Sequence, residues 1–183
     1  MRYISLIFVF ILLGCVSAQQ KNPNKTEAIQ KELDKDSFQI YFEEAFPKQS
    51  SGFIRAADHI NFSSSGSSSQ KINISDGNYY VKFEKDSVFG DLPFYGERYS
   101  GHSTKNNDRI EFESKPKNYK FSSKTKNNRI QTNISFVTKD LNSTAEEYEV
   151  SIKIFENGKA NMHISSSNRS GMGFKGKLDF VEK

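Results

Sequence analysis

The three histidines are the first side chains to consider for acid–base or metal chemistry. They lie at His59, His102 and His163, and none has the His-Glu-x-x-His spacing that puts two ring nitrogens on one face of a helix. His163 stands between Met162 and Ile164 in an alternating run, which predicts that its ring points to solvent. We therefore expect each histidine to have a surface or structural role.

The serines and carboxylates also lack a catalytic arrangement. No Gly-x-Ser-x-Gly motif is present, so no serine is expected on a nucleophile elbow. The pairs Glu43-Glu44 and Glu146-Glu147 are adjacent, and neighbours on a strand point to opposite faces, so neither pair can share acid and base roles. Cys15 is the only cysteine, which excludes an internal disulfide and a thiolate metal site. The sequence predicts a protein that is not an enzyme, with no catalytic residues, no metal and no cofactor.

The stretch 86–101 is the strongest candidate for binding. It holds aromatic residues, Pro93 and three glycines between two sets of alternating residues, so we expect the sheet pattern to pause there. Aromatic rings and a guanidinium can stack on sugars or hold anions. The predicted ligand-binding residues are Phe94, Tyr95, Arg98 and Tyr99. The alternative is that residues 92–99 pack across one end of the fold.

Residues 1–18 have the layout of an export signal. A positive start precedes an apolar run at 4–13 that is too short to span a membrane, and Val16-Ser17-Ala18 fits a signal-peptidase site. Alternatively, Leu12-Leu13-Gly14-Cys15 resembles a bacterial lipobox, in which case residues 1–14 are removed and Cys15 is lipidated. Both alternatives predict an exported protein, periplasmic, anchored to the outer membrane or secreted. A lipid anchor would be its only contact with a membrane.

The rest of the chain is predicted to form one domain. We expect residues 19–37 to be a linker with a short helix, and residues 38–183 to be a single antiparallel β-barrel domain. The chain has 183 residues and a formal charge of +4, a basic excess too small for a nucleic-acid partner. We expect a monomer whose partner is an unidentified envelope protein or a small ligand.

Apolar and polar residues alternate through most of the domain, which predicts a mainly β fold of about eight to ten antiparallel strands joined in sequence as a meander. Asp76-Gly77 predicts a two-residue hairpin turn, with Ile74 facing Tyr79 and Ile72 facing Val81.

Two later turns contain residues that tolerate positive φ, at Asn127-Asn128 and at Gly158. At Gly158 only a bulged three-residue turn keeps the apolar residues on one face. The predicted cross-strand pairs are Phe121 with Ile134, Tyr119 with Phe136, Ile152 with Met162, and Val150 with Ile164.

The interior of such a barrel can be filled by side chains or can hold one small ligand. Six phenylalanines are expected on the inner face and look large enough to fill it: Phe42, Phe83, Phe121, Phe136, Phe174 and Phe180.

Two segments together resemble a known family. Residues 73–101 contain Asn-Ile-Ser-Asp-Gly-Asn-Tyr-Tyr-Val-Lys-Phe and Leu-Pro-Phe-Tyr-Gly-Glu-Arg-Tyr-Ser-Gly, and residues 155–169 contain Phe-Glu-Asn-Gly-Lys-Ala and Ser-Ser-Ser-Asn-Arg. They resemble the domain-of-unknown-function family 4251, a family of secreted or lipoprotein-like envelope proteins of Bacteroidetes. The likeness spans about residues 33–178, with departures at 63–69 and 103–108. It implies a lipocalin- or calycin-like barrel and brings no catalytic residues.

Three functions remain open on these grounds. The first is a non-enzymatic binding or interaction module of the bacterial cell envelope, secreted or lipid-anchored. The second is a carrier of a small apolar ligand inside a lipocalin-like barrel. The third is an enzyme acting on envelope glycans or peptides, for which the sequence supplies no catalytic group. The ligand or partner and the oligomeric state do not follow from the sequence.

Overall fold

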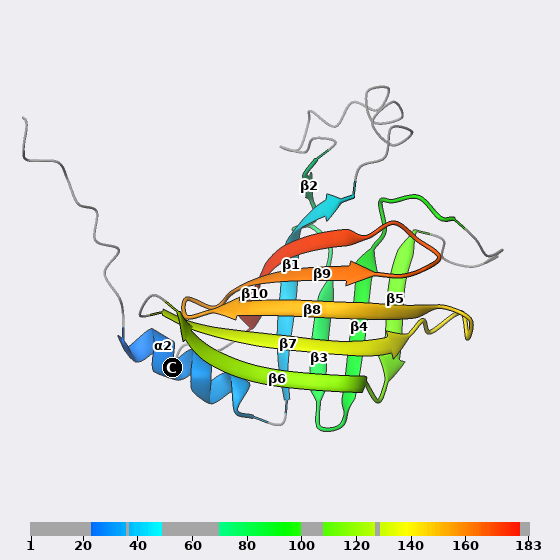
Figure 1. Ribbon diagram of the computed structural model, residues 1–183. Helices are drawn as coiled ribbons and strands as arrows, with labels where there is room; N and C mark the ends of the chain where they lie inside the picture. The colour runs from blue at the N-terminus through cyan, green and yellow to red at the C-terminus, as the bar shows by residue number, and fades with distance from the viewer. Residues whose placement is uncertain (1–22, 36, 49–69, 100–107, 127–128, 180–183) are drawn as a thin grey trace, which may run out of the picture.

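The computed structural model describes residues 23–35, 37–48, 70–99, 108–126 and 129–179 (Figure 1). The predicted signal segment with Cys15, the histidines His59 and His102, and Phe180 lie outside these ranges. The described elements are α2 (Pro23–Leu33), β1 (Ser37–Pro47), β2 (Ile72–Asn73), β3 (Tyr80–Glu84), β4 (Ser87–Pro93), β5 (Arg109–Ser114), β6 (Lys117–Lys126), β7 (Arg129–Lys139), β8 (Glu147–Phe155), β9 (Lys159–Ser165) and β10 (Met172–Asp179).

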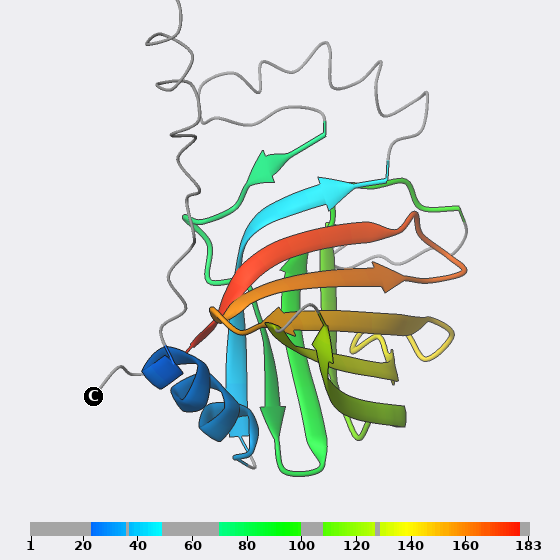
Figure 2. The same cartoon turned by 60° about the vertical axis from the view of Figure 1, so that its left-hand side comes forward.

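The strands form one antiparallel sheet in the order β5-β4-β3-β1-β10-β9-β8-β7-β6, with β2 paired to β1. Most strands pair with the strand that follows them in the sequence. In addition β1, the first long strand, pairs with β10, the last. The order places β5 and β6 at opposite ends of the path, so the curled sheet is a half-barrel with one open seam. Figures 1 and 2 show β6–β9 crossing over β3–β5, and both groups of strands contribute buried residues to one hydrophobic core. The predicted mainly β, lipocalin-like antiparallel class is confirmed.

Helix α2 is the short N-terminal helix that the sequence predicts. It lies against the half-barrel near β1 (Figure 2). Its two large apolar residues, Ile29 and Leu33, are buried in the core, as expected for a helix that lies on the sheet. Of the described helical residues, no segment is long and apolar enough to cross a membrane.

The two later hairpins confirm most of the predicted register. Phe121 faces Ile134, and Lys126 faces Arg129, while the predicted turn residues Asn127 and Asn128 between them lie outside the described ranges. In the β8–β9 hairpin the two predicted pairs are both present, and Gly158 has a φ of 80°.

One pair in the first of these hairpins is wrong. The register of β6 shifts between Lys117 and Lys120, where Asn118 has a φ of 52°. This bulge places two residues, Asn118 and Tyr119, opposite the single residue Phe136, so the predicted one-to-one pair of Tyr119 with Phe136 is not formed. Tyr119 is 44% exposed.

The predicted hairpin at Asp76-Gly77 is also wrong. Ile72 faces Ala45 and Val81 faces Ile40, so β2 and β3 both pair with β1 and not with each other. The turn at Asp76-Gly77 interrupts a strand that continues along the same edge of β1. Burying both apolar segments against β1 satisfies the same alternation as the hairpin, which is why the pattern alone did not distinguish them.

The stretch 86–101 does not interrupt the sheet throughout. Its first half, Ser87–Pro93, is β4, a strand paired on both sides. Gly90, at the centre of β4, interrupts the alternation of apolar and polar side chains. An added Cβ there would lie 2.2 Å from the Phe112 ring, so the position requires glycine.

The interior is filled, largely as predicted. Phe42, Phe83, Phe136 and Phe174 are buried, and the rings of Phe42 and Phe174 lie 5.7 Å apart. Phe121 is the exception, since 40% of it is exposed. It lies at the end of the sheet path, where no further strand covers it.

Candidate functional site

The structure separates the four predicted ligand-binding residues. They follow β4, at the corner where this strand meets the loops after β7 and β9. Phe94 is buried and Tyr95 is partly buried against the core. Tyr99 is 62% exposed, whereas the Arg98 side chain is only 17% exposed. Phe94 and Tyr95 therefore pack against the core, as the alternative interpretation of residues 92–99 expects.

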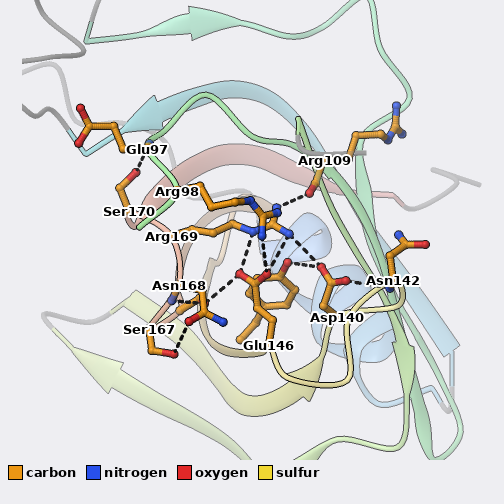
Figure 3. Close-up of polar contacts among 12 residues, drawn as sticks. Glu97, Arg98, Arg109, Asp140, Asn142, Glu146, Ser167, Asn168, Arg169 and Ser170 are labelled. Carbon is orange, nitrogen blue, oxygen red and sulfur yellow. Dashed lines mark hydrogen bonds and ion pairs between the residues drawn. The ribbon is translucent and has the colours of Figure 1, made fainter. Parts of the chain in front are cut away.

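The corner contains a buried ion network centred on Arg169 (Figure 3). Its Nε donates to Oε1 of Glu146 at 2.7 Å, and its Nη2 donates at 3.1 Å to Oε2 of Glu146 and to Oδ2 of Asp140. The Nη1 group donates to the backbone carbonyl of Arg109. The three charged side chains are each at most 4% exposed. Arg169 thus links the β7–β8 loop to the first residue of β5.

Arg98 is the second cation of this network. Its Nη1 donates to Oε2 of Glu146 at 3.3 Å. Figure 3 shows the Arg98 and Arg169 side chains lying side by side above Glu146. Their backbones form a β-bridge, which holds the two guanidinium groups together.

Backbone hydrogen bonds fasten the loops around the network. Tyr99 N donates to Asn168 O and Ser170 N donates to Glu97 O, each at 2.8 Å. Glu97 N donates to Oγ of Ser170 at 3.0 Å. The loop after β4 and the loop after β9 are therefore joined as a short ribbon.

Aromatic rings enclose the Arg169 guanidinium. Its carbon lies 5.2 Å from the centroid of Phe94 and 5.6 Å from that of Tyr148, within cation–π range. The Tyr148 hydroxyl donates to Asp140 Oδ2. Burial, followed by this hydrogen bond, raises the pKa of Tyr148 far above its usual value, so the phenol stays neutral.

The centre of this network is fully hydrogen-bonded and leaves no room for a ligand. Every nitrogen of the Arg169 guanidinium has an acceptor. The adjoining cavity, lined by Phe94, Tyr148 and Arg169 among others, has a volume of only about 10 Å³. A space of that size holds at most one water molecule. Among the described residues no group of three or more His, Cys, Asp or Glu side chains could hold a metal ion.

The sequence contained a signal for the two buried carboxylates. Glu146 is in phase with Tyr148 and Val150 on the buried face of β8, and Asp140 is in phase with Phe136 and Thr138 of β7. A carboxylate that continues a buried face requires a cationic partner. That signal did not identify the partner, since Arg169 lies in a loop far along the chain.

A larger apolar groove opens at the opposite ends of β4 and β5. Its volume is about 510 Å³. Phe38 and Phe83 line it as a stacked pair with centroids 4.6 Å apart, and the Tyr119 ring lies 6.4 Å from Phe83. Phe121 and Val88 extend the apolar lining. The two partly exposed aromatic residues are Tyr119, which lies in the β6 bulge, and Phe121, which lies on the strand that borders the open seam.

Charged side chains surround the apolar part of the groove: Asp34, Lys35, Lys85, Asp86 and Lys115. Lys35 pairs with Glu32, and Lys115 lies 3.5 Å from Asp86. Within the described part of the chain Lys85 has no ion-pair partner. Burial raises the pKa of the Tyr119 hydroxyl, so this group is a neutral hydrogen-bonding phenol. The groove therefore combines an apolar interior with a polar rim.

A second, polar groove of about 460 Å³ lies on the outer face of the sheet. His163 lines it beside its cross-strand partner Ser151. The exposed position of His163 confirms its predicted outward orientation. Among the described residues no hydrogen bond joins His163 to a serine or carboxylate, so no oriented nucleophile and base are formed there.

A curled antiparallel half-barrel with a filled interior and a groove at one end defines a lipocalin-like β protein. The chain belongs to the family described as "Domain of unknown function (DUF4251)", which it matches over residues 20–178. This confirms the family resemblance of the two sequence segments. No curated protein and no solved structure matched the chain.

Proposed function

We propose that the protein is a non-enzymatic binding module of the bacterial cell envelope and that its groove at the open seam takes a small amphipathic ligand. The observation that carries this proposal is the pair of partly exposed rings, Tyr119 and Phe121, above the stacked rings of Phe38 and Phe83. Apolar pockets of a few hundred cubic ångströms with a few polar groups are typical of small-molecule sites.

The groove, and not the barrel interior, is the proposed ligand site. The rings of Phe42, Phe112 and Phe174 are buried inside the half-barrel. A ligand with an apolar body would cover the rings in the groove and leave its polar head among the lysines and aspartates of the rim. This refines the carrier alternative, because the ligand would lie at the mouth of the half-barrel.

The contribution of Phe121 to such binding can be estimated. A phenylalanine buries roughly 200 Å² when covered. With 40% exposed, about 80 Å² would be covered by the ligand, worth up to about 2 kcal/mol. A loss of that size corresponds to a weakening of about 30-fold.

The test is titration of the full mature chain with N-phenyl-1-naphthylamine, a neutral apolar fluorophore. We expect saturable binding, displacement by dodecanoate, and at least a tenfold weakening in Phe121→Ser and Tyr119→Ser. Leu141→Ser is the matched control, because Leu141 is also an exposed apolar side chain, at 58%, but lies outside the groove. Equal affinity in all three variants, or no saturable binding by the wild type, would contradict the proposal.

Export to the envelope is part of the proposal and rests on residues 1–18. The intact mass of protein purified from a bacterial envelope distinguishes its two forms. A mass starting at Gln19 supports the signal-peptidase site, and a mass starting at an acylated Cys15 supports a lipid anchor. Retention of Met1 in the cytoplasmic fraction would contradict export.

A further inference from the structure

Arg98 has one edge of its guanidinium that no group of the described residues uses. Its Nε and Nη2 are buried and have no hydrogen-bond partner. These two nitrogens carry N–H bonds that point the same way, so together they form a two-pronged donor. Leaving charged donors of this kind buried without an acceptor is strongly unfavourable.

Arg169 shows what such an edge binds in the same corner. Its own Nε and Nη2 hold the two oxygens of Glu146 at 2.7 and 3.1 Å. The equivalent edge of Arg98 therefore has the geometry that fits two oxygens of one acidic group.

Arg98 lies closer to the surface than Arg169. Its side chain is 17% exposed, compared with 4% for Arg169, although its Nε and Nη2 atoms are themselves buried, so an incoming group must displace the atoms that cover them. The neighbouring Tyr99 is 62% exposed and can contribute an aromatic surface.

The distribution of charge also favours an acidic ligand at Arg98. Both carboxylates of the network are engaged chiefly by Arg169, whereas Arg98 has one contact of 3.3 Å to Glu146. Arg98 is therefore the less compensated of the two cations. The bridge between residues 98 and 169 and the ribbon around it hold the guanidinium in position before any ligand binds.

We propose that the Nε–Nη2 edge of Arg98 is a binding site for an oxyanion, a carboxylate or phosphate group of a small ligand. This site is separate from the groove and lies at the other end of β4 and β5. It does not depend on the function proposed for the groove.

The test uses the full mature chain and two probes, inorganic phosphate and acetate, against sodium chloride at matched ionic strength. The readout is the nitrogen-15 NMR signal of each arginine Nε. We expect the Arg98 signal alone to shift in a saturable manner with a millimolar dissociation constant. A response to phosphate, acetate or both identifies which oxyanion the edge accepts.

The decisive variant is Arg98→Lys, which keeps the charge and can still reach Glu146 but lacks the two-pronged edge. We expect the affinity for the probe to fall at least tenfold, followed in the variant through the Tyr99 backbone amide. Arg129→Lys is the matched control, because Arg129 is an exposed arginine at 67%, and its affinity should match the wild type. The proposal is overturned if no arginine signal saturates at tens of millimolar probe, if the responding signal belongs to another arginine, or if Arg98→Lys binds as tightly as the wild type.

Discussion

Replacing Arg169 with methionine tests whether the corner network stabilises the fold. The substitution keeps an unbranched side chain of similar length but removes the charge and every donor. Glu146 and Asp140 would remain buried, at 1% and 3% side-chain exposure, after losing the Arg169 guanidinium; Glu146 would keep only the 3.3 Å contact with Arg98 as an ion pair, and Asp140 only the Tyr148 hydroxyl and a backbone donor. Removing one partner of a buried ion pair typically costs 3–5 kcal/mol, so we expect a loss of about 4 kcal/mol in the free energy of unfolding.

The expected loss in the free energy of unfolding depends on how deeply the ion pair is buried, and not on the distance between its nitrogen and oxygen atoms. Lys177 and Glu43 form a shorter pair, at 2.5 Å, but their side chains are 64% and 44% exposed. Water competes for such a pair, so we expect Lys177→Met to lose less than about 1 kcal/mol. It is the matched control, because it also replaces one paired cation with methionine.

The assay is equilibrium urea unfolding of the mature protein and both variants, followed by far-ultraviolet circular dichroism. A difference of about 3 kcal/mol or more between Arg169→Met and Lys177→Met is the expected result. If Arg169→Met does not fold at all, Arg169→Lys should give an intermediate loss, because it keeps the charge but lacks the paired Nε and Nη2 donors of the guanidinium. Equal and small losses in Arg169→Met and the control would refute the reasoning.

Two further predictions concern pH and the sheet. Because the pKa of Tyr148 is raised by burial, the unfolded chain releases this proton first above about pH 10, and the folded form should lose about 1.4 kcal/mol per pH unit from it. Urea unfolding between pH 9 and 11 should show a shallower decline in Tyr148→Phe, and an unchanged slope would exclude this cause. In Gly176→Ala the added Cβ would lie 1.9 Å from the backbone oxygen of Tyr41, so thermal unfolding should show a loss of about 1–3 kcal/mol. Gly173→Ala, where the nearest atom is 3.4 Å away, should be nearly neutral, and equal effects at the two glycines would contradict the clash.

Local rules predicted the parts of the fold that depend on neighbouring residues. The Gly158 turn follows from one requirement, that Ile152 and Met162 share a face, and both are buried as expected. The same alternation could have marked Glu146 as buried. These features depend on a few consecutive residues, so the sequence is sufficient for them.

Features that depend on distant segments were not predictable in the same way. Ile72 and Val81 could pair with each other or with β1, and alternation is satisfied by both arrangements. Phe121 reads as an inner-face residue, yet it is exposed because the sheet path ends at β6. For the candidate sites, the sequence indicated Arg98. It did not indicate that Glu146 is the partner of Arg98, and it did not indicate the groove, because each of these depends on segments that are far apart in the chain.

The pairing of β1 with β10 has a consequence for how the chain folds. Gln39 faces Asp179, so the two strands that join the halves of the sheet come from opposite ends of the described chain. Bringing such distant segments together costs loop entropy before it forms contacts, which slows folding. The half-barrel cannot be completed until β10 is available. The sheet of a growing chain therefore stays unclosed at β1 until the segment that forms β10 has been made.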